Sequence, residues 1–253
     1  MSASRTILLT TIAMIAFAGN SLLCRAALLN TTIDAASFTS IRLISGALML
    51  WLIMRFRYKR WAVTGNWNSG FALFIYAAGF SYAYISLSTA TGALLLFAAV
   101  QTTMIAYGIW RGERLHQSQL VGLLLSFGGL AVLFMPGLTA PPVYGALLML
   151  AAGVAWGIYS LRGKTAGKPI LVTTGNFLRA TVFTALMSMI MINDSTVDTR
   201  GVVFAVLSGA LASGLGYAIW YSVLPWLRAT NAASVQLSVP VISAFGGSIL
   251  LGE

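Results

Sequence analysis

The chain has 253 residues, of which 58% are hydrophobic and 8% are charged, and its formal net charge is +10. This composition excludes a soluble globular domain, in which about a quarter of the residues are charged. Several runs of roughly 20 apolar residues predict membrane-spanning helices, whereas the short alternating segments of a β-barrel are absent. The positive charges lie beside apolar runs, where they report orientation in a membrane, so they do not indicate a nucleic-acid-binding face.

Apolar length and breaker residues predict nine spans joined by short connections. They are expected at residues 6–29, 33–55, 67–87, 91–110, 118–135, 143–161, 170–192, 201–225 and 232–251. The first run follows Arg5 and has no small-residue cleavage site, so we expect a first membrane helix rather than a removed signal peptide.

Lysine and arginine are distributed unequally between the two sides of this arrangement. With the N-terminus inside, the cytoplasmic segments hold Arg5, Arg55, Arg57, Lys59, Arg60, Arg111, Arg114, Arg162, Lys164, Lys168 and Arg228. The outer side holds Arg25 and Arg200. This bias predicts a cytoplasmic N-terminus.

Two stretches of the chain correspond at a separation of 140 positions. Residues 91–113 read TGALLLFAAVQTTMIAYGIWRGE and residues 231–253 read NAASVQLSVPVISAFGGSILLGE, and both end in Gly-Glu. The match predicts a duplicated unit, with residues 1–138 and 139–253 as its copies. A unit of five spans inserts its second copy upside down, so the expected fold is an all-α membrane protein built as an inverted repeat of two five-helix units. A tenth span would begin after Glu253, and we expect the sequence to be truncated there.

These features together resemble the EamA-type branch of the drug/metabolite transporter superfamily. The resemblance is carried by the repeated unit, by Arg42 and Arg179 in the second helix of each copy, and by RGE and LGE at the ends of the fourth helices. Within that family the chain is most similar to bacterial exporters of aromatic amino acids. The resemblance implies a ten-helix, multi-pass protein of the bacterial inner membrane. Val100 stands where the second copy has Pro240, so a proline hinge would serve one half only.

Arg42 and Arg179 are expected near the bilayer centre, where an arginine must face protein or a water-filled cavity. In the functional interpretation one of them attracts a substrate carboxylate. In the structural interpretation, which we favour, each guanidinium holds backbone carbonyl groups at a helix break.

Aromatic residues occupy matching faces of the third and eighth spans, with two more in the sixth. They are Tyr76, Phe80, Tyr84; Tyr217, Trp220, Tyr221; and Trp156, Tyr159. A cavity lined from both sides by these rings would suit a flat apolar solute with a polar end. Packing between helices explains any single ring as well, and for the two faces together the alternatives are evenly balanced.

Several polar or helix-breaking residues lie on or near the repeated fourth helices. Gln101, Gln236 and Ser243 are expected either to line the pathway or to bond between helices. Pro240 removes a backbone hydrogen bond within its span, so a kink or hinge is expected there. Glu113 and Glu253 oppose the helix dipole at a C-terminus, which predicts a specific partner, such as the N-terminus of a neighbouring helix, and a structural or gating role.

The sequence therefore predicts a secondary transporter that exports aromatic or other hydrophobic amino acids and related metabolites by alternating access. The alternatives are a drug carrier, a nucleotide-sugar or phosphate-ester carrier, or an integral membrane enzyme. An enzyme is disfavoured because His116 lies in a loop, Cys24 is the one cysteine, and no carboxylate pair lies within the spans. We expect no metal and no cofactor, and as partners a small-molecule substrate and the lipid bilayer, with the chain a monomer or weak dimer. No carboxylate or histidine lies within the spans, so we expect no obligatory proton exchange.

Overall fold

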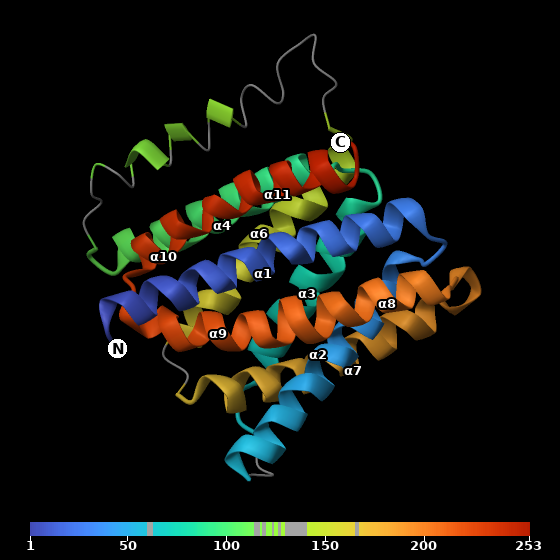
Figure 1. Ribbon diagram of the computed structural model, residues 1–253, viewed down its shortest axis with the longest axis horizontal. Coiled ribbons are helices and arrows are strands. Elements are labelled where there is room, and N and C mark those ends of the chain that lie inside the picture. The colour runs from blue at the N-terminus through green and yellow to red at the C-terminus, as the bar shows by residue number, and fades with distance from the viewer. Residues whose placement is uncertain are drawn as a thin grey trace.

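In the computed structural model the chain folds into long helices that cross one another (Figure 1). The structure describes residues 1–59, 63–113, 117, 120–122, 124–125, 128–129, 141–164 and 167–253. Within these residues there are helices and no strands, which confirms the all-α prediction. Seven of the described helical segments are long and apolar enough to cross a membrane.

The helices match eight of the nine predicted spans to within a few residues. The first six are α1 (Ala3–Asn30), α2 (Ala35–Tyr58), α3 (Trp67–Tyr84), α4 (Thr89–Trp110), α6 (Val143–Lys164) and α7 (Pro169–Ile190). The short η1 (Ile192–Asp194) precedes the eighth span. Most of the predicted fifth span, together with His116, lies outside the described residues.

The eighth span is continuous but not uniformly α-helical. It consists of α8 (Thr199–Leu207), the π-helix η2 (Ser208–Leu215), α9 (Gly216–Val223) and the 3-10 turn η3 (Leu224–Trp226). The π-helical residues SGALASGL are small and cross α2 closely, since a Cβ on Gly209 would collide with the carbonyl oxygen of Arg42. Single-turn π-bulges are frequent at functional sites, and this longer stretch was not predicted.

The ninth span breaks into α10 (Ala229–Gln236) and α11 (Ser238–Leu250), with Leu237 between them. Pro240 lies in the first turn of α11, where its ring excludes the hydrogen bond to the carbonyl of Gln236. The helix is thus interrupted just before Pro240, and a kink or hinge there remains a prediction. Its counterpart α4 contains no proline and is unbroken.

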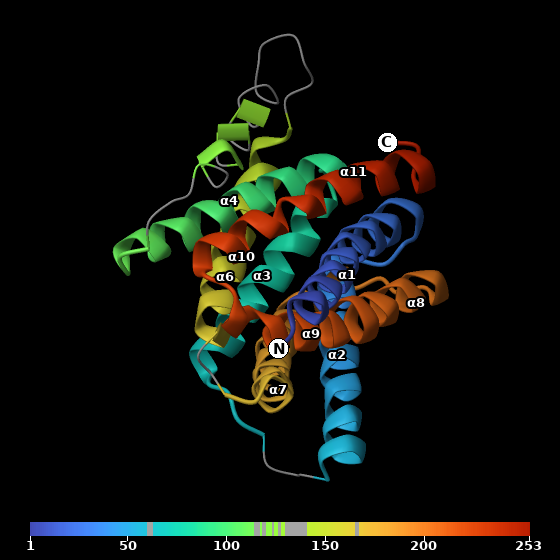
Figure 2. The same ribbon diagram turned by 60° about the vertical axis from the view of Figure 1, so that its left-hand side comes forward.

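The helices α4 and α10–α11 lie side by side in Figures 1 and 2. The helix α3 runs through the interior of the bundle (Figure 2). The helix α3 packs on α6, α7 and α2, so protein surrounds it on several sides. The aromatic side chains of α3 therefore meet those of α6 and α9 at the centre.

Backbone hydrogen bonds join the two halves near the starts of α2 and α7. The N–H of Asp34 at the start of α2 donates to the carbonyl of Thr196, 3.0 Å away, in the segment before α8. Near the start of α7, the carbonyl of Leu171 accepts from the N–H of Thr64, at 3.3 Å, in the segment before α3. Asp34 and Leu171 are 137 positions apart, the separation of Arg42 and Arg179. These contacts favour the two predicted units, whose boundaries remain a prediction.

Candidate functional site

Arg42 on α2 lies at the centre of the bundle and is fully buried. Its Nε donates to Ser213 Oγ at 3.0 Å, and its Nη2 donates to the hydroxyls of Tyr76 and Tyr217 at 3.1 and 2.9 Å. The guanidinium carbon lies 5.2 Å from the ring centroid of Tyr76 and 4.9 Å from that of Phe80, within cation–π range. Nη1 has no hydrogen-bond partner among the described residues. The charge is thus held by neutral groups and retains one open donor.

A network of neutral polar groups extends from Arg42. The hydroxyl of Tyr217 donates to that of Tyr76 at 3.1 Å, and Asn20 Nδ2 donates to the same Tyr76 oxygen at 3.2 Å. Asn20 Oδ1 in turn accepts from Ser208 Oγ at 2.6 Å. The π-helix η2 therefore contributes Ser208 and Ser213 to the centre, beside groups from α1, α2, α3 and α9.

Aromatic rings surround this network and touch one another. The Trp156 ring from α6 lies 5.0 Å from Tyr76, 4.6 Å from Tyr217 and 5.3 Å from Phe17, centroid to centroid. Phe17 also contacts Trp220, at 5.8 Å. All five rings are buried, so the two predicted aromatic faces do meet, but here they pack on each other and their side chains fill the centre.

The sixth and ninth spans are joined by Gln236, which orients the central tryptophan. Trp156 Nε1 donates to Gln236 Oε1 at 2.9 Å, while Gln236 Nε2 donates to the carbonyl of Ala232 at 3.0 Å. Gln101 on α4 and Ser243 on α11 are also buried. The structure thus places Gln236 in contact with the ring cluster.

The remaining aromatic candidates lie at the edge of the cluster. The Tyr159 ring is 5.7 Å from Trp156 and 5.4 Å from Tyr221, whose hydroxyl donates to the Tyr159 carbonyl at 3.2 Å. Trp220 is fully buried, and its indole N–H has no partner among the described residues. Phe80 stacks edge-on against Tyr84 at 4.7 Å.

Arg179 has a different environment from Arg42. Its Nη1 donates to the carbonyl oxygens of Thr64 at 3.0 Å and Gly175 at 2.8 Å, and its guanidinium lies 5.8 Å from the ring of Trp67. These contacts match the structural interpretation, because Arg179 fixes the segment that enters α3. The structure does not bring it into the central cluster.

The two Gly-Glu ends cap each other's helices. Glu113, after α4, accepts from the N–H groups of Ala229 and Thr230 at the start of α10, both at 3.2 Å. Glu253, after α11, accepts from the N–H of Thr89 at the start of α4, at 2.6 Å. The expected partners, neighbouring helix N-termini, are thereby confirmed. A gating role remains a prediction.

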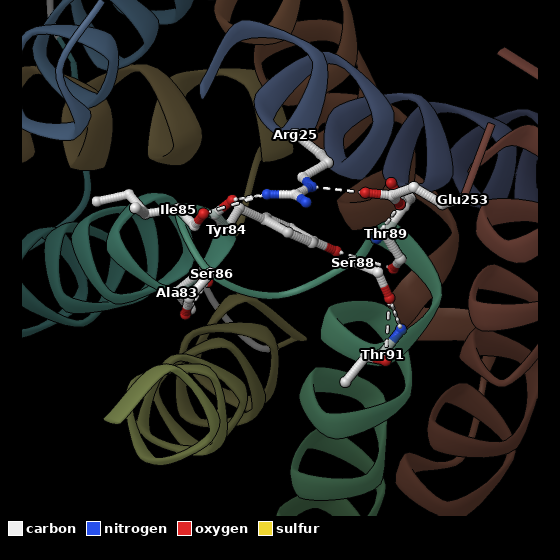
Figure 3. Close-up of polar contacts among 9 residues, drawn as sticks. All are labelled: Arg25, Ala83, Tyr84, Ile85, Ser86, Ser88, Thr89, Thr91 and Glu253. Carbon is white, nitrogen blue, oxygen red and sulfur yellow. Dashed lines mark hydrogen bonds and ion pairs between the residues drawn. The ribbon is translucent and has the colours of Figure 1, made fainter. Parts of the chain in front are cut away.

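Arg25 adds a third element to the cap at Glu253 (Figure 3). Its Nε forms an ion pair with Glu253 at 2.6 Å, and its Nη1 donates to the carbonyls of Tyr84 and Ile85 at the end of α3, at 3.0 and 3.2 Å. Burial opposes ionisation of the Glu253 carboxyl, but Arg25 and the N–H of Thr89 outweigh it and lower its pKa. Burial likewise opposes ionisation of Glu113, and the N–H groups of Thr230 and Ala229 lower its pKa.

Sequence reasoning missed Phe17 and Ser213 as members of the central site. Phe17 lies 139 positions before Trp156, close to the spacing of the repeat, and that correspondence was the available signal. Ser213 lies in a run of small residues that indicates close helix packing. Its bond to Arg42 depends on the π-helix, which carries no simple sequence signature.

Comparison with known proteins identifies the family. The sequence profile of the EamA-like transporter family matches residues 143–253. The uncharacterized protein PA1977 of Pseudomonas aeruginosa is 57% identical over 98% of this chain and 87% of its own length. This chain belongs to the EamA-like transporter family.

Two other matches place the chain within a wider group. A probable amino-acid metabolite efflux pump of Escherichia coli is 26% identical over 73% of this chain and 68% of its own length. A solved crystal structure superposes with a TM-score of 0.76, at 19% identity, over 99% of this chain and 90% of that one, which shows the fold. As a member of this family with seven helices able to cross a membrane among the described residues, the chain is a multi-pass membrane transporter.

Proposed function

We propose that this EamA-family protein exports aromatic or hydrophobic amino acids and related carboxylate-bearing metabolites across the bacterial inner membrane, with its N-terminus in the cytoplasm. The single observation that carries the proposal is Arg42, a fully buried cation with an open donor inside a group of aromatic rings. A guanidinium is matched to a carboxylate in charge and geometry, and the rings are matched to a flat apolar body.

Binding requires the rings to separate, because their side chains contact one another in this state. The rings come from α1, α3, α6 and α9, so a shift of these helices against one another would open the centre toward one side at a time. Transport by alternating access follows from that arrangement.

The environment of Arg42 disfavours the other carriers that we considered. A phosphate ester would need several cations, whereas Arg42 is the only fully buried charged side chain among the described residues. A cationic drug would be repelled by Arg42 in a site of low dielectric constant.

The experiment presents tryptophan, an organophosphate and a cationic drug side by side to vesicles containing the purified protein. Transport of tryptophan alone supports the proposal, and transport of the organophosphate or the drug alone contradicts it. Vesicles without protein give the background rate.

A further inference from the structure

Every carboxylate of this chain has a position away from the central cluster. The sequence contains five acidic residues. Asp34 caps α2, Asp198 caps α8, and Glu113 and Glu253 cap α10 and α4. Asp194 is exposed in η1. No acidic side chain of the chain is therefore available to neutralise Arg42.

The central cluster also has open donors rather than open anionic acceptors. Arg42 Nη1 and Trp220 Nε1 are buried and have no partner among the described residues. The amide oxygens nearest the rings are already used, since Asn20 Oδ1 accepts from Ser208 and Gln236 Oε1 accepts from Trp156. A ligand that supplies acceptors satisfies these two N–H donors, and an ammonium group does not.

The net charge of the occupied site distinguishes two kinds of substrate. A carboxylate without an ammonium brings the site, with Arg42, to zero charge. A zwitterionic amino acid leaves it at +1, with an ammonium that has no counter-ion near a buried guanidinium. Burying an unpaired charge is costly, because low dielectric surroundings disfavour the ionised form.

We infer that the preferred substrate is a net monoanion, an aromatic or hydrophobic carboxylate that lacks a free ammonium, such as a 2-oxo acid or an arylacetate. This inference rests on the proposed function and narrows its substrate class. The carboxylate of either molecule would accept from Nη1 of Arg42, and the oxo oxygen of a 2-oxo acid would accept from the indole N–H of Trp220.

Carrying a monoanion makes transport electrogenic. For one elementary charge, a potential of about 100 mV is equivalent to a concentration ratio of roughly 50-fold. In a cell whose interior is negative this favours export, and it does so without any coupled ion. A zwitterion, which has no net charge, would gain nothing from the potential.

The test uses phenylpyruvate and phenylalanine, which share a ring and a carboxylate and differ in the oxo and ammonium groups. The full chain is reconstituted in vesicles, and a potassium gradient with a potassium ionophore sets the potential. We expect phenylpyruvate to enter at least ~10-fold faster than phenylalanine. An inside-positive potential of about 100 mV should concentrate it inside up to roughly 50-fold, whichever way the protein is inserted.

The outcomes separate the two proposals. If phenylalanine enters faster, or if phenylpyruvate stops at equal concentrations whatever the potential, the inference is wrong and the proposed function stands. If neither probe enters, both fail.

A pair of variants adds a test on the same chain. Arg42→Gln should abolish the preference for phenylpyruvate, while Arg200→Gln, which removes an exposed arginine at the start of α8, should leave preference and potential dependence unchanged. Gel filtration in detergent shows whether each variant folds. If Arg42→Gln does not fold, the potential dependence of the unmodified protein decides the question. Retention of the preference by a folded Arg42→Gln would overturn the inference.

Discussion

The fold accommodates the buried, charged Arg42 because neutral hydroxyl groups accept hydrogen bonds from its guanidinium. Each hydroxyl acceptor restores one hydrogen bond that the guanidinium lost with water, and the faces of Tyr76 and Phe80 add an electrostatic attraction. Removing one acceptor leaves a buried charged donor unsatisfied, which costs about 1–3 kcal/mol.

Tyr217→Phe removes such an acceptor while keeping the ring. We expect transport to fall several-fold, because the guanidinium loses its 2.9 Å bond and its orientation. Tyr84→Phe is the matched control, since the Tyr84 hydroxyl donates to the Thr89 carbonyl, whereas Arg42 bonds Ser213, Tyr76 and Tyr217. Initial rates are compared at equal amounts of folded protein in vesicles. Equal rates for the two variants would contradict a role for the Tyr217 hydroxyl.

Truncating whole rings tests whether the aromatic faces act on substrate or only on folding. Trp220→Ala and Tyr76→Ala should reduce transport of an aromatic substrate more than they reduce the folded protein in the membrane. Parallel losses of both quantities would show that these rings serve packing alone. Membrane-extracted monodisperse protein and vesicle transport are the two measurements.

For single residues, the sequence shows which side chains are unusual for a membrane span, but it does not show which groups they contact. Arg42 is conspicuous because arginine is rare in a membrane span, and the matched rings are conspicuous because they repeat. Arg179 occupies the position equivalent to Arg42 in the second repeat, yet its guanidinium donates to backbone carbonyl groups. The difference arises from which loop lies beside each guanidinium, and that is a property of tertiary packing.

At the scale of helices, the Gly-Glu ends supply charges where two helices begin. An N-terminus presents unpaired N–H groups and a positive dipole end, so a carboxylate there stabilises the helix by about 0.5–2 kcal/mol. The bounds of most helices followed from apolar length to within a few residues. The π-helix η2, in which Gly209 crosses α2 closely, was not predicted from apolar length.

The caps predict a pH dependence of stability. Glu113 and Glu253 have pKa values below their ordinary value of 4.5, so they stabilise the fold above about pH 4.5 and lose that contribution as the pH falls through their lowered pKa values. Thermal unfolding in detergent should show this loss in acid. Glu113→Gln and Glu253→Gln should each destabilise the protein by about 1 kcal/mol at pH 7 and weaken the acid dependence. Asp194→Asn, which alters an exposed carboxylate, is the control, and identical acid curves for all variants would refute the assignment.

The break between α10 and α11 predicts a separate effect of proline. Pro240→Ala allows residue 240 to bond the carbonyl of Gln236, so the two helices should fuse into one. If the break serves as a hinge, folded yield should stay the same or rise while the transport rate falls several-fold. Val100→Ala on the unbroken α4 is the matched control. A transport rate equal to that of the unmodified protein would show that the break is not a hinge.

At the scale of the whole molecule, the question is what drives transport. A proton-coupled carrier needs a group within the membrane whose protonation alternates. The acidic residues of this chain lie at helix ends, and arginine stays protonated in proteins. We therefore expect an imposed pH gradient, with the electrical potential clamped at zero, to drive no substrate above equilibrium. Accumulation that an uncoupler abolishes would disprove this and direct attention to Asp34 and Glu253.

The reciprocal caps constrain how such a molecule can change shape. Because Glu113 fastens one end of the α4 and α10–α11 pair and Glu253 fastens the other, these antiparallel helices cannot splay at either end while both caps hold. We expect them to move together, with any bending at Leu237 between α10 and α11. Access to the rings then changes when α1 and α3 shift against this pair, and Arg25 is a contact that such a shift must break at its end of the bundle. Distances between spin labels on α4 and α11 should accordingly stay constant during turnover while distances from either helix to α1 change.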